Sequence, residues 1–175
     1  LRTPTLPTDR YMAIEDPTGL IAAIADAWSL EAAGDAILAP LADGRLGSLA
    51  APWVGLIALD GNLTEALLRQ IAGSPLFARA DLRLAPASPG KAERLLPLMT
   101  HRGATLYVNR QEAGLLTGAD HATSRIAAEA LVAAGASRAL VTDGAQDTSD
   151  AARGAETLTC PARAVKTRRI TGAGD

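Results

Sequence analysis

The sequence predicts an α/β fold: a mainly parallel central sheet covered by helices, with a small β element near the N-terminus. Apolar runs typical of strands alternate with helical patterns over most of the 175 residues. One of these runs, Trp53–Leu59, is almost uninterrupted, which is typical of a strand buried on both faces of a parallel sheet. Polar clusters follow several of the predicted strands, where ligands bind in such folds.

Composition narrows the class of protein. Hydrophobic residues make up 48% of the chain, enough for one core of ordinary size. The net charge of −2 gives no electrostatic reason to expect nucleic acid or an anionic membrane as a partner. No apolar run reaches the roughly 20 residues that cross a bilayer, and no signal peptide is visible, so a cytoplasmic protein is expected. Cys160 is the single cysteine, which excludes an internal disulfide.

The first third of the chain predicts a hairpin, a weak helix and a strand. Two apolar runs flank the turn sequence Asp16–Gly19, and Asp-Pro followed by Gly favours a hairpin. The elements expected here are strands at Tyr11–Ile14 and Leu20–Ala25, a helix at Leu30–Leu41 and the strand at Trp53–Leu59.

The remaining chain predicts alternating helices and strands, several with recognisable ends. Thr64 can cap a helix over Glu65–Ala72, and Ser88 can cap one that carries Lys91 through Met99. The other elements expected are strands at Leu82–Ala85, Thr105–Val108, Arg138–Val141, Thr157–Cys160 and Ala162–Lys166, helices at Arg110–Leu116 and from Thr123 or Ser124 to Ala134, and a polar loop at Asp147–Glu156.

The last residues of the chain, Thr171–Asp175, contain the most distinctive candidate. Glycine tolerates backbone conformations that let several N–H groups surround an anion, so Gly172, Ala173 and Gly174 could form an anion hole. Asp175 would then be a candidate base, an arrangement suited to phosphoryl transfer. A plain glycine turn followed by a helix-capping aspartate is the alternative.

Two further clusters have equally open interpretations. Asn109 and Glu112 lie three residues apart at the start of a helix, which suits either a hydrated Mg²⁺ with its phosphates or a capping box. Thr142 and Gly144 follow a strand and could hold a nucleotide, or they could form an ordinary turn. Lys91 could neutralise a phosphate, although a single lysine is more commonly a solvated surface residue.

Taken in order, Asn-x-x-Glu at 109–112, Thr-Asp-Gly at 142–144 and Thr-Gly-Ala-Gly-Asp at 171–175 resemble the ribokinase-like (PfkB) family of carbohydrate and nucleoside kinases. The segments Asp16–Gly19, Asp60–Leu63 and Ser88–Ala92 resemble its pseudouridine kinase branch. The resemblance runs from about Tyr11 to Asp175. It implies a partial ribokinase-like domain over residues 1–175, with a lid hairpin at about 8–27 and an α/β core at 28–175.

The resemblance also implies a reaction and its residues. ATP, with Mg²⁺, would donate its γ-phosphoryl group to a hydroxyl of a small-molecule sugar or nucleoside, with pseudouridine as the expected acceptor. The implied roles are base for Asp175, anion hole for Gly172, Ala173 and Gly174, nucleotide contacts for Asn109, Thr142 and Gly144, Mg²⁺ organisation for Glu112, and substrate or phosphate contacts for Asn62 and Lys91. A homodimer through the lid is a further expectation.

The sequence departs from the family pattern at Ala85, Val108 and Asp147. Similar kinases also continue at both ends, so this polypeptide alone is expected to be inactive or nearly so. Two alternatives remain: a non-catalytic nucleotide-binding relative, and an NAD-binding oxidoreductase. The second is weakened because no Gly-x-Gly-x-x-Gly follows the first strand of a βαβ unit.

Overall fold

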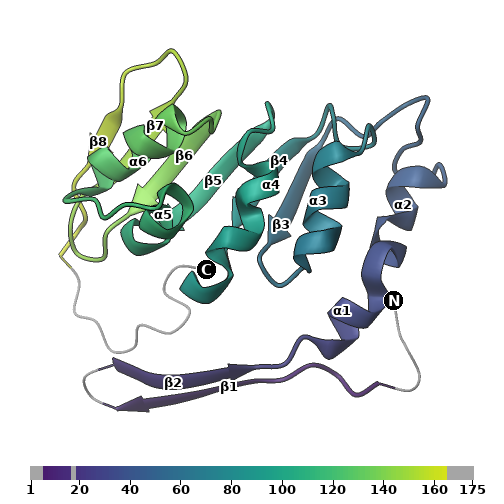
Figure 1. Ribbon diagram of the computed structural model, residues 1–175, viewed down its shortest axis with the longest axis horizontal. Coiled ribbons are helices and arrows are strands. Elements are labelled where there is room, and N and C mark those ends of the chain that lie inside the picture. Colours follow the sequence, from purple (N-terminus) through teal and green to yellow (C-terminus); the bar gives the residue numbers. More distant parts are fainter. Residues whose placement is uncertain (1–5, 17–18, 165–175) are drawn as a thin grey trace.

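The computed structural model describes residues 6–16 and 19–164, and two sheets form within them. The larger sheet has six strands in the order β3-β4-β5-β6-β7-β8. The smaller is the two-stranded hairpin β1-β2, which Figure 1 shows below the main sheet and joined to it through α1. The strands are β1 Tyr11–Asp16, β2 Gly19–Ala25, β3 Leu56–Asp60, β4 Asp81–Ala85, β5 Ala104–Asn109, β6 Arg138–Thr142, β7 Thr148–Ala152 and β8 Leu158–Cys160.

The first four strands of the main sheet are parallel, so their carboxyl ends share one edge. Asp60 pairs with Ala85 across β3 and β4, and Asn109 pairs with Thr142 across β5 and β6. Strands β7 and β8 then run antiparallel to their neighbours. This topology gathers the polar residues that follow β3, β5 and β6 along one edge, as the sequence predicted.

Helices cover one face of the main sheet (Figure 1). The residues of β4, β5 and β6 that point to this face are buried, and they include Leu84, Leu106 and Val141 at 0% exposure. The helical segments are α1 Trp28–Ala33, the 3-10 helix η1 Gly34–Leu38, α2 Ala39–Ala42, α3 Glu65–Gly73, the 3-10 helix η2 Pro89–Leu95, α4 Leu96–Met99, α5 Arg110–Thr117 and α6 Ser124–Ala133.

Side chains on the other face of the sheet are more exposed. Leu56 at the start of β3 is 65% exposed, and Ala58 on the same face is exposed as well. The prediction that Trp53–Leu59 is a strand buried on both faces was therefore wrong in two respects. The strand begins only at Leu56, and it is well covered on one side only.

Local capping explains where three helices begin. The side-chain oxygens of Thr64, Asn109 and Thr123 accept hydrogen bonds from the backbone N–H groups of Leu67, Glu112 and Ile126. Each bond satisfies a donor that the first turn of a helix leaves without a partner. Gly118 ends α5 with a φ of 70°, a left-handed conformation that glycine adopts without strain.

Four other sequence predictions were wrong in whole or in part. Ser88 makes no capping bond, and the predicted single helix is η2 followed by α4. The weak helix at Leu30–Leu41 is broken into α1, η1 and α2, with Gly34 at a φ of 51°. The polar stretch Asp147–Glu156 is not all loop, because Thr148–Ala152 forms β7. Of the predicted strand at Ala162–Lys166, residues 162–164 are not in a strand, and the others lie outside the described residues.

The hairpin is fastened at its base. The Asp9 carboxylate, just before β1, accepts hydrogen bonds from the backbone N–H and hydroxyl of Ser29 in α1 at 2.9 and 2.7 Å. These bonds lower the pKa of Asp9. Asp26 follows β2, and its carboxylate accepts a hydrogen bond from the N–H of Trp28. The Trp28 residue itself is 75% exposed. Both arms of the hairpin therefore meet at the start of α1.

Candidate functional site

A cavity of about 800 Å³ lies between the hairpin and the edge of the main sheet where the parallel strands end. It brings together Asn62, Lys91 and Glu112, three of the residues singled out in the sequence. The rest of its wall comes from the hairpin and its base and from the segment after β4: Asp9, Arg10, Tyr11, Ala23, Ala25, Asp26, Ala27, Leu30, Ala87, Ser88 and Pro89.

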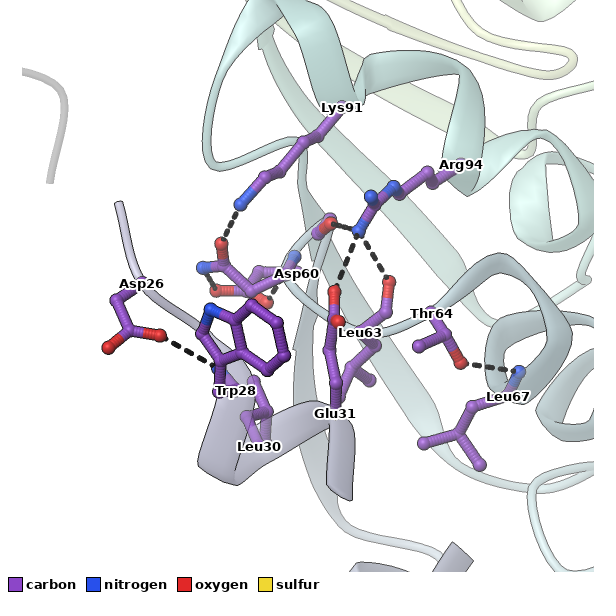
Figure 2. A network of polar contacts seen from close by, with 12 residues as sticks. Asp26, Trp28, Leu30, Glu31, Asp60, Leu63, Thr64, Leu67, Lys91 and Arg94 are labelled. Atoms are coloured by element: carbon purple, nitrogen blue, oxygen red, sulfur yellow. Dashed lines mark hydrogen bonds and ion pairs between the residues drawn. The ribbon is translucent and has the colours of Figure 1, made fainter. Parts of the chain in front are cut away.

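A chain of hydrogen bonds holds Asn62 and Lys91 in one wall of this cavity. The Nζ of Lys91 donates to Oδ1 of Asn62 at 2.6 Å, and Nδ2 of Asn62 donates to Oδ2 of Asp60 at 2.8 Å. Lysine can only donate and an ionised aspartate can only accept, so the orientation of the Asn62 amide is fixed by its two partners. The Lys91 ammonium keeps donors for a ligand. Figure 2 shows the Lys91 side chain pointing toward the amide that is hydrogen-bonded to Asp60.

The Asn109–Glu112 pair forms a capping box. Oδ1 of Asn109 accepts from the N–H of Glu112 at 2.8 Å, and Oε2 of Glu112 accepts from the N–H of Asn109 at 2.9 Å. The capping-box interpretation of the Asn109–Glu112 spacing is thus confirmed. Glu112 is only 8% exposed, and burial raises the pKa of its carboxyl. Because Glu112 also lines the cavity, capping does not prevent a role in binding.

Thr142 and Gly144 lie farther along the same edge, in and after β6. Thr142 is the register partner of Asn109, and both Thr142 and Gly144 are exposed. The guanidinium of Arg110 steadies this turn, since its Nε donates to Asp143 at 2.8 Å and its Nη1 donates to the carbonyl of His121 at 2.7 Å. Neither Thr142 nor Gly144 lines the cavity, so the edge has two neighbouring regions, with α5 beginning between them.

The predicted base and anion hole, Asp175 with Gly172, Ala173 and Gly174, lie outside the described residues. In the described part of the chain, no group of three or more His, Cys, Asp or Glu side chains could hold a metal ion. No helix among the residues that the structure describes is long and apolar enough to cross a membrane.

Comparison with solved structures identifies the architecture. A carbohydrate kinase from Agrobacterium tumefaciens matches with a TM-score of 0.66 and 27% identity over 90% of this chain. A ribokinase from Thermotoga maritima matches with a TM-score of 0.68 and 19% identity over 96% of it. The fold is ribokinase-like. A ribokinase from Arabidopsis thaliana complexed with ribose and ATP has the same fold, with a TM-score of 0.60 and 16% identity over 89% of this chain.

The ribokinase-like region is about half the length of these kinases, because the matches cover 48%, 52% and 48% of the three chains, respectively. No protein-family model matches the sequence, and no curated protein matches it. The fold class predicted from sequence is confirmed, including the mainly parallel sheet, the flanking helices and the small antiparallel sheet.

Sequence reasoning missed several charged residues around the site. Arg94 contacts the loop that carries Asn62, and Arg110 contacts the turn that carries Asp143. Asp9 lines the cavity from the base of the hairpin. A signal existed for Arg94, which lies three residues after Lys91 in the same predicted helix, and for Arg110, which lies inside the Asn109–Glu112 motif.

Proposed function

We propose that this chain carries part of the active site of a kinase that transfers the γ-phosphoryl group of ATP to a hydroxyl of a sugar or nucleoside, with pseudouridine as the acceptor. The observation that carries the proposal is the cavity at the carboxyl ends of the parallel strands, which Asn62, Lys91 and Glu112 share in a ribokinase-like fold. The resemblance of the 109–112, 142–144 and 171–175 motifs to this kinase family adds the expected roles.

The acceptor would occupy the cavity beneath the hairpin, which would serve as a lid of about residues 8–27. Lys91 and Asn62 offer an ammonium and an amide for acceptor oxygens or for a phosphate. Thr142, Gly144 and Asn109 would contact the nucleotide at the neighbouring part of the edge. The volume of about 800 Å³ is adequate for a molecule of nucleoside size.

Transfer requires the acceptor hydroxyl to lose its proton as its oxygen bonds to the γ-phosphorus. In this proposal Asp175 takes that proton, the bond from the γ-phosphorus to the bridging oxygen breaks, and ADP leaves. Backbone N–H groups of Gly172, Ala173 and Gly174 would stabilise the charge on the phosphoryl oxygens. These groups would accelerate the reaction by orienting the acceptor hydroxyl and neutralising charge on the phosphoryl oxygens. No covalent enzyme intermediate forms.

The residues present fit a magnesium ion held through water. Mg²⁺ commonly retains several waters and binds one or two carboxylates together with substrate phosphates. Glu112 is a buried carboxylate in the cavity wall whose Oε2 already accepts from Asn109. Its position suits a bridging water, and the ion would supply positive charge to the phosphates.

The outward face of the hairpin also supports a homodimer formed through the lid. Met12 and Ile24 are register partners, and with Ile14 they lie on the face opposite Tyr11, Ala23 and Ala25, which line the cavity. These three outward side chains are 55%, 60% and 50% exposed, respectively. A second copy could cover such an apolar strip.

Calorimetry and a coupled ADP-release assay test the proposal together. We expect ATP to bind more tightly with Mg²⁺ than without it, and pseudouridine to bind more tightly than ribose. Lys91→Ala should weaken acceptor binding about tenfold or more, because a charged hydrogen-bond donor is lost. Arg69→Ala, an exposed arginine on α3 paired with Glu65, is the matched control.

The outcomes separate the candidates. ATP binding with acceptor turnover supports the kinase, whereas ATP binding without turnover in a version extended to the length of the similar kinases supports the non-catalytic alternative. Preference for NAD over ATP would contradict both.

A further inference from the structure

The 3-10 helix η2 carries two cations three residues apart, Lys91 and Arg94, and only Lys91 has a place in the proposed binding scheme. Residues three apart lie on the same side of a 3-10 helix. Lys91 contacts the side chain of Asn62, and Arg94 contacts the backbone on both sides of it. Nη1 of Arg94 donates to the carbonyls of Gly61 and Leu63 at 3.2 and 3.4 Å.

The loop that these cations hold is packed closely against η2 and the segment that precedes it. A Cβ at Gly61 would come within 2.1 Å of the Pro86 carbonyl oxygen and 3.0 Å of Lys91. The N–H of Gly61 donates to the carbonyl of Ala85 at 3.1 Å. A small displacement of this loop would therefore move Asn62 and, with it, the Lys91 ammonium that Asn62 holds.

Arg94 also reaches the helix that follows the hairpin. Nη1 lies 3.9 Å from Oε1 of Glu31 in α1, as Figure 2 shows together with the bond to Leu63. Helix α1 begins at Trp28, three residues after β2 ends at Ala25, and Asp9 binds its first turn. One guanidinium group thus lies between the base of the hairpin and the loop in the cavity wall.

We propose that Arg94 is a positioning residue. It fixes the 61–63 loop so that Asn62 and Lys91 are held for an acceptor, and through Glu31 it couples that loop to α1 at the base of the hairpin. The consequence for acceptor binding rests on the proposed function, but the positioning itself can be measured without any ligand.

The ligand-free test is backbone amide exchange at Gly61, Asn62 and Leu63, followed by NMR. Arg94→Ala should raise exchange at these amides about tenfold or more relative to the wild-type protein, because hydrogen bonds from a charged donor are lost. Arg69→Ala should leave it unchanged. Arg94→Lys should give an intermediate value, since one ammonium replaces the planar guanidinium. Exchange at the wild-type rate in Arg94→Ala would overturn the proposal.

Glu31→Gln tests the connection to α1. It keeps the shape of the side chain and removes its charge, so exchange should rise in both the 61–63 loop and the first turn of α1. An increase in neither segment would overturn the coupling. If Arg94→Ala does not fold, Arg94→Lys and Glu31→Gln decide the question by the same measurement.

Acceptor titration then connects positioning to binding. Arg94→Ala should raise the Kd or KM for the nucleoside about tenfold and leave the KM for ATP unchanged. If the wild-type protein binds no nucleoside, the proposed function fails, while the exchange data still decide the role of Arg94. If the nucleoside binds equally well to wild type and Arg94→Ala, the inferred link to the acceptor is wrong and the proposed function stands.

Discussion

Glu112 combines a structural and a chemical position in one side chain. Its carboxylate closes the capping box with Asn109, and the same side chain lines the cavity. Burial raises its pKa above the ordinary value of 4.5, so the folded protein holds this proton more tightly than the unfolded chain does. Glu112 therefore contributes its full stabilisation of the folded state at pH values below that ordinary pKa. This contribution is lost as the pH rises through the raised pKa.

Glu112→Gln should accordingly stabilise the protein at neutral pH. Glutamine can still accept the hydrogen bond from the N–H of Asn109, and it removes the cost of burying a charge. The difference from wild type in the free energy of unfolding should shrink as the pH falls through the raised pKa of Glu112, because the wild-type carboxyl becomes protonated. Urea unfolding at neutral pH and at an acidic pH below that raised pKa measures this difference.

Glu93→Gln is the control for that comparison, because Glu93 is exposed. We expect it to change the free energy of unfolding little at either pH. A Glu112→Gln protein that is less stable than wild type at neutral pH would show that the charged form of Glu112 is favourable.

Asn62, Lys91 and Glu112 were named from sequence and line one cavity, while their roles in binding stay predictions. Arg94 was missed because its bonds to Gly61 and Leu63 go to backbone carbonyls, which have the same chemistry in every sequence. Only the folded loop brings two carbonyls to one guanidinium.

Most strands and helices could be predicted because their ends carry strong local signals, such as Thr64, Asn109 and Gly118. Strand β7 was missed for a physical reason. Its buried positions are Ser149 and Ala151, small residues that produce no apolar alternation. Ser149 satisfies its hydroxyl with Ser124 and Thr159, contacts between distant segments that no local pattern reveals.

The loop after β3 provides a direct test of close packing between elements. Gly61→Ala should destabilise the protein by about 1–3 kcal/mol, because the new methyl group meets the Pro86 carbonyl and the backbone must move. It should also weaken acceptor binding through Asn62. Chemical denaturation and acceptor titration on the same variant measure the two effects.

Gly73→Ala is the matched control, since a Cβ there meets nothing within 4 Å. This change should stabilise the protein by about 0.4–1 kcal/mol or leave it unaffected. Equal losses of stability in the two variants would mean that the close approach of Gly61 to the Pro86 carbonyl is not what restricts residue 61.

The molecule as a whole has two layers and an attached hairpin, and the sequence predicted these parts but not how well each is covered. The apolar runs indicated buried strands, yet Leu56 and the outward side chains of the hairpin are exposed. Hydrophobicity predicts that a surface will be buried, but it does not identify what buries it.

A homodimer through the hairpin should therefore depend on its outward face. Ile24→Lys places a charge in the apolar strip with Met12 and Ile14, and it should weaken self-association about tenfold or more. Sedimentation velocity over a range of concentrations measures the association. Ile126→Lys, at a similarly exposed position on α6, should have no effect. A wild-type protein that remains monomeric throughout would exclude this dimer.

The two tryptophans give the protein a built-in optical readout. Trp28 lies exposed at the root of the hairpin with its backbone tied to Asp26, whereas Trp53 packs against the core. Their emission spectra should differ in wavelength, and a neutral quencher such as acrylamide should reach Trp28 first. The fluorescence of Trp28 can thus report on changes at the base of the hairpin without any added label.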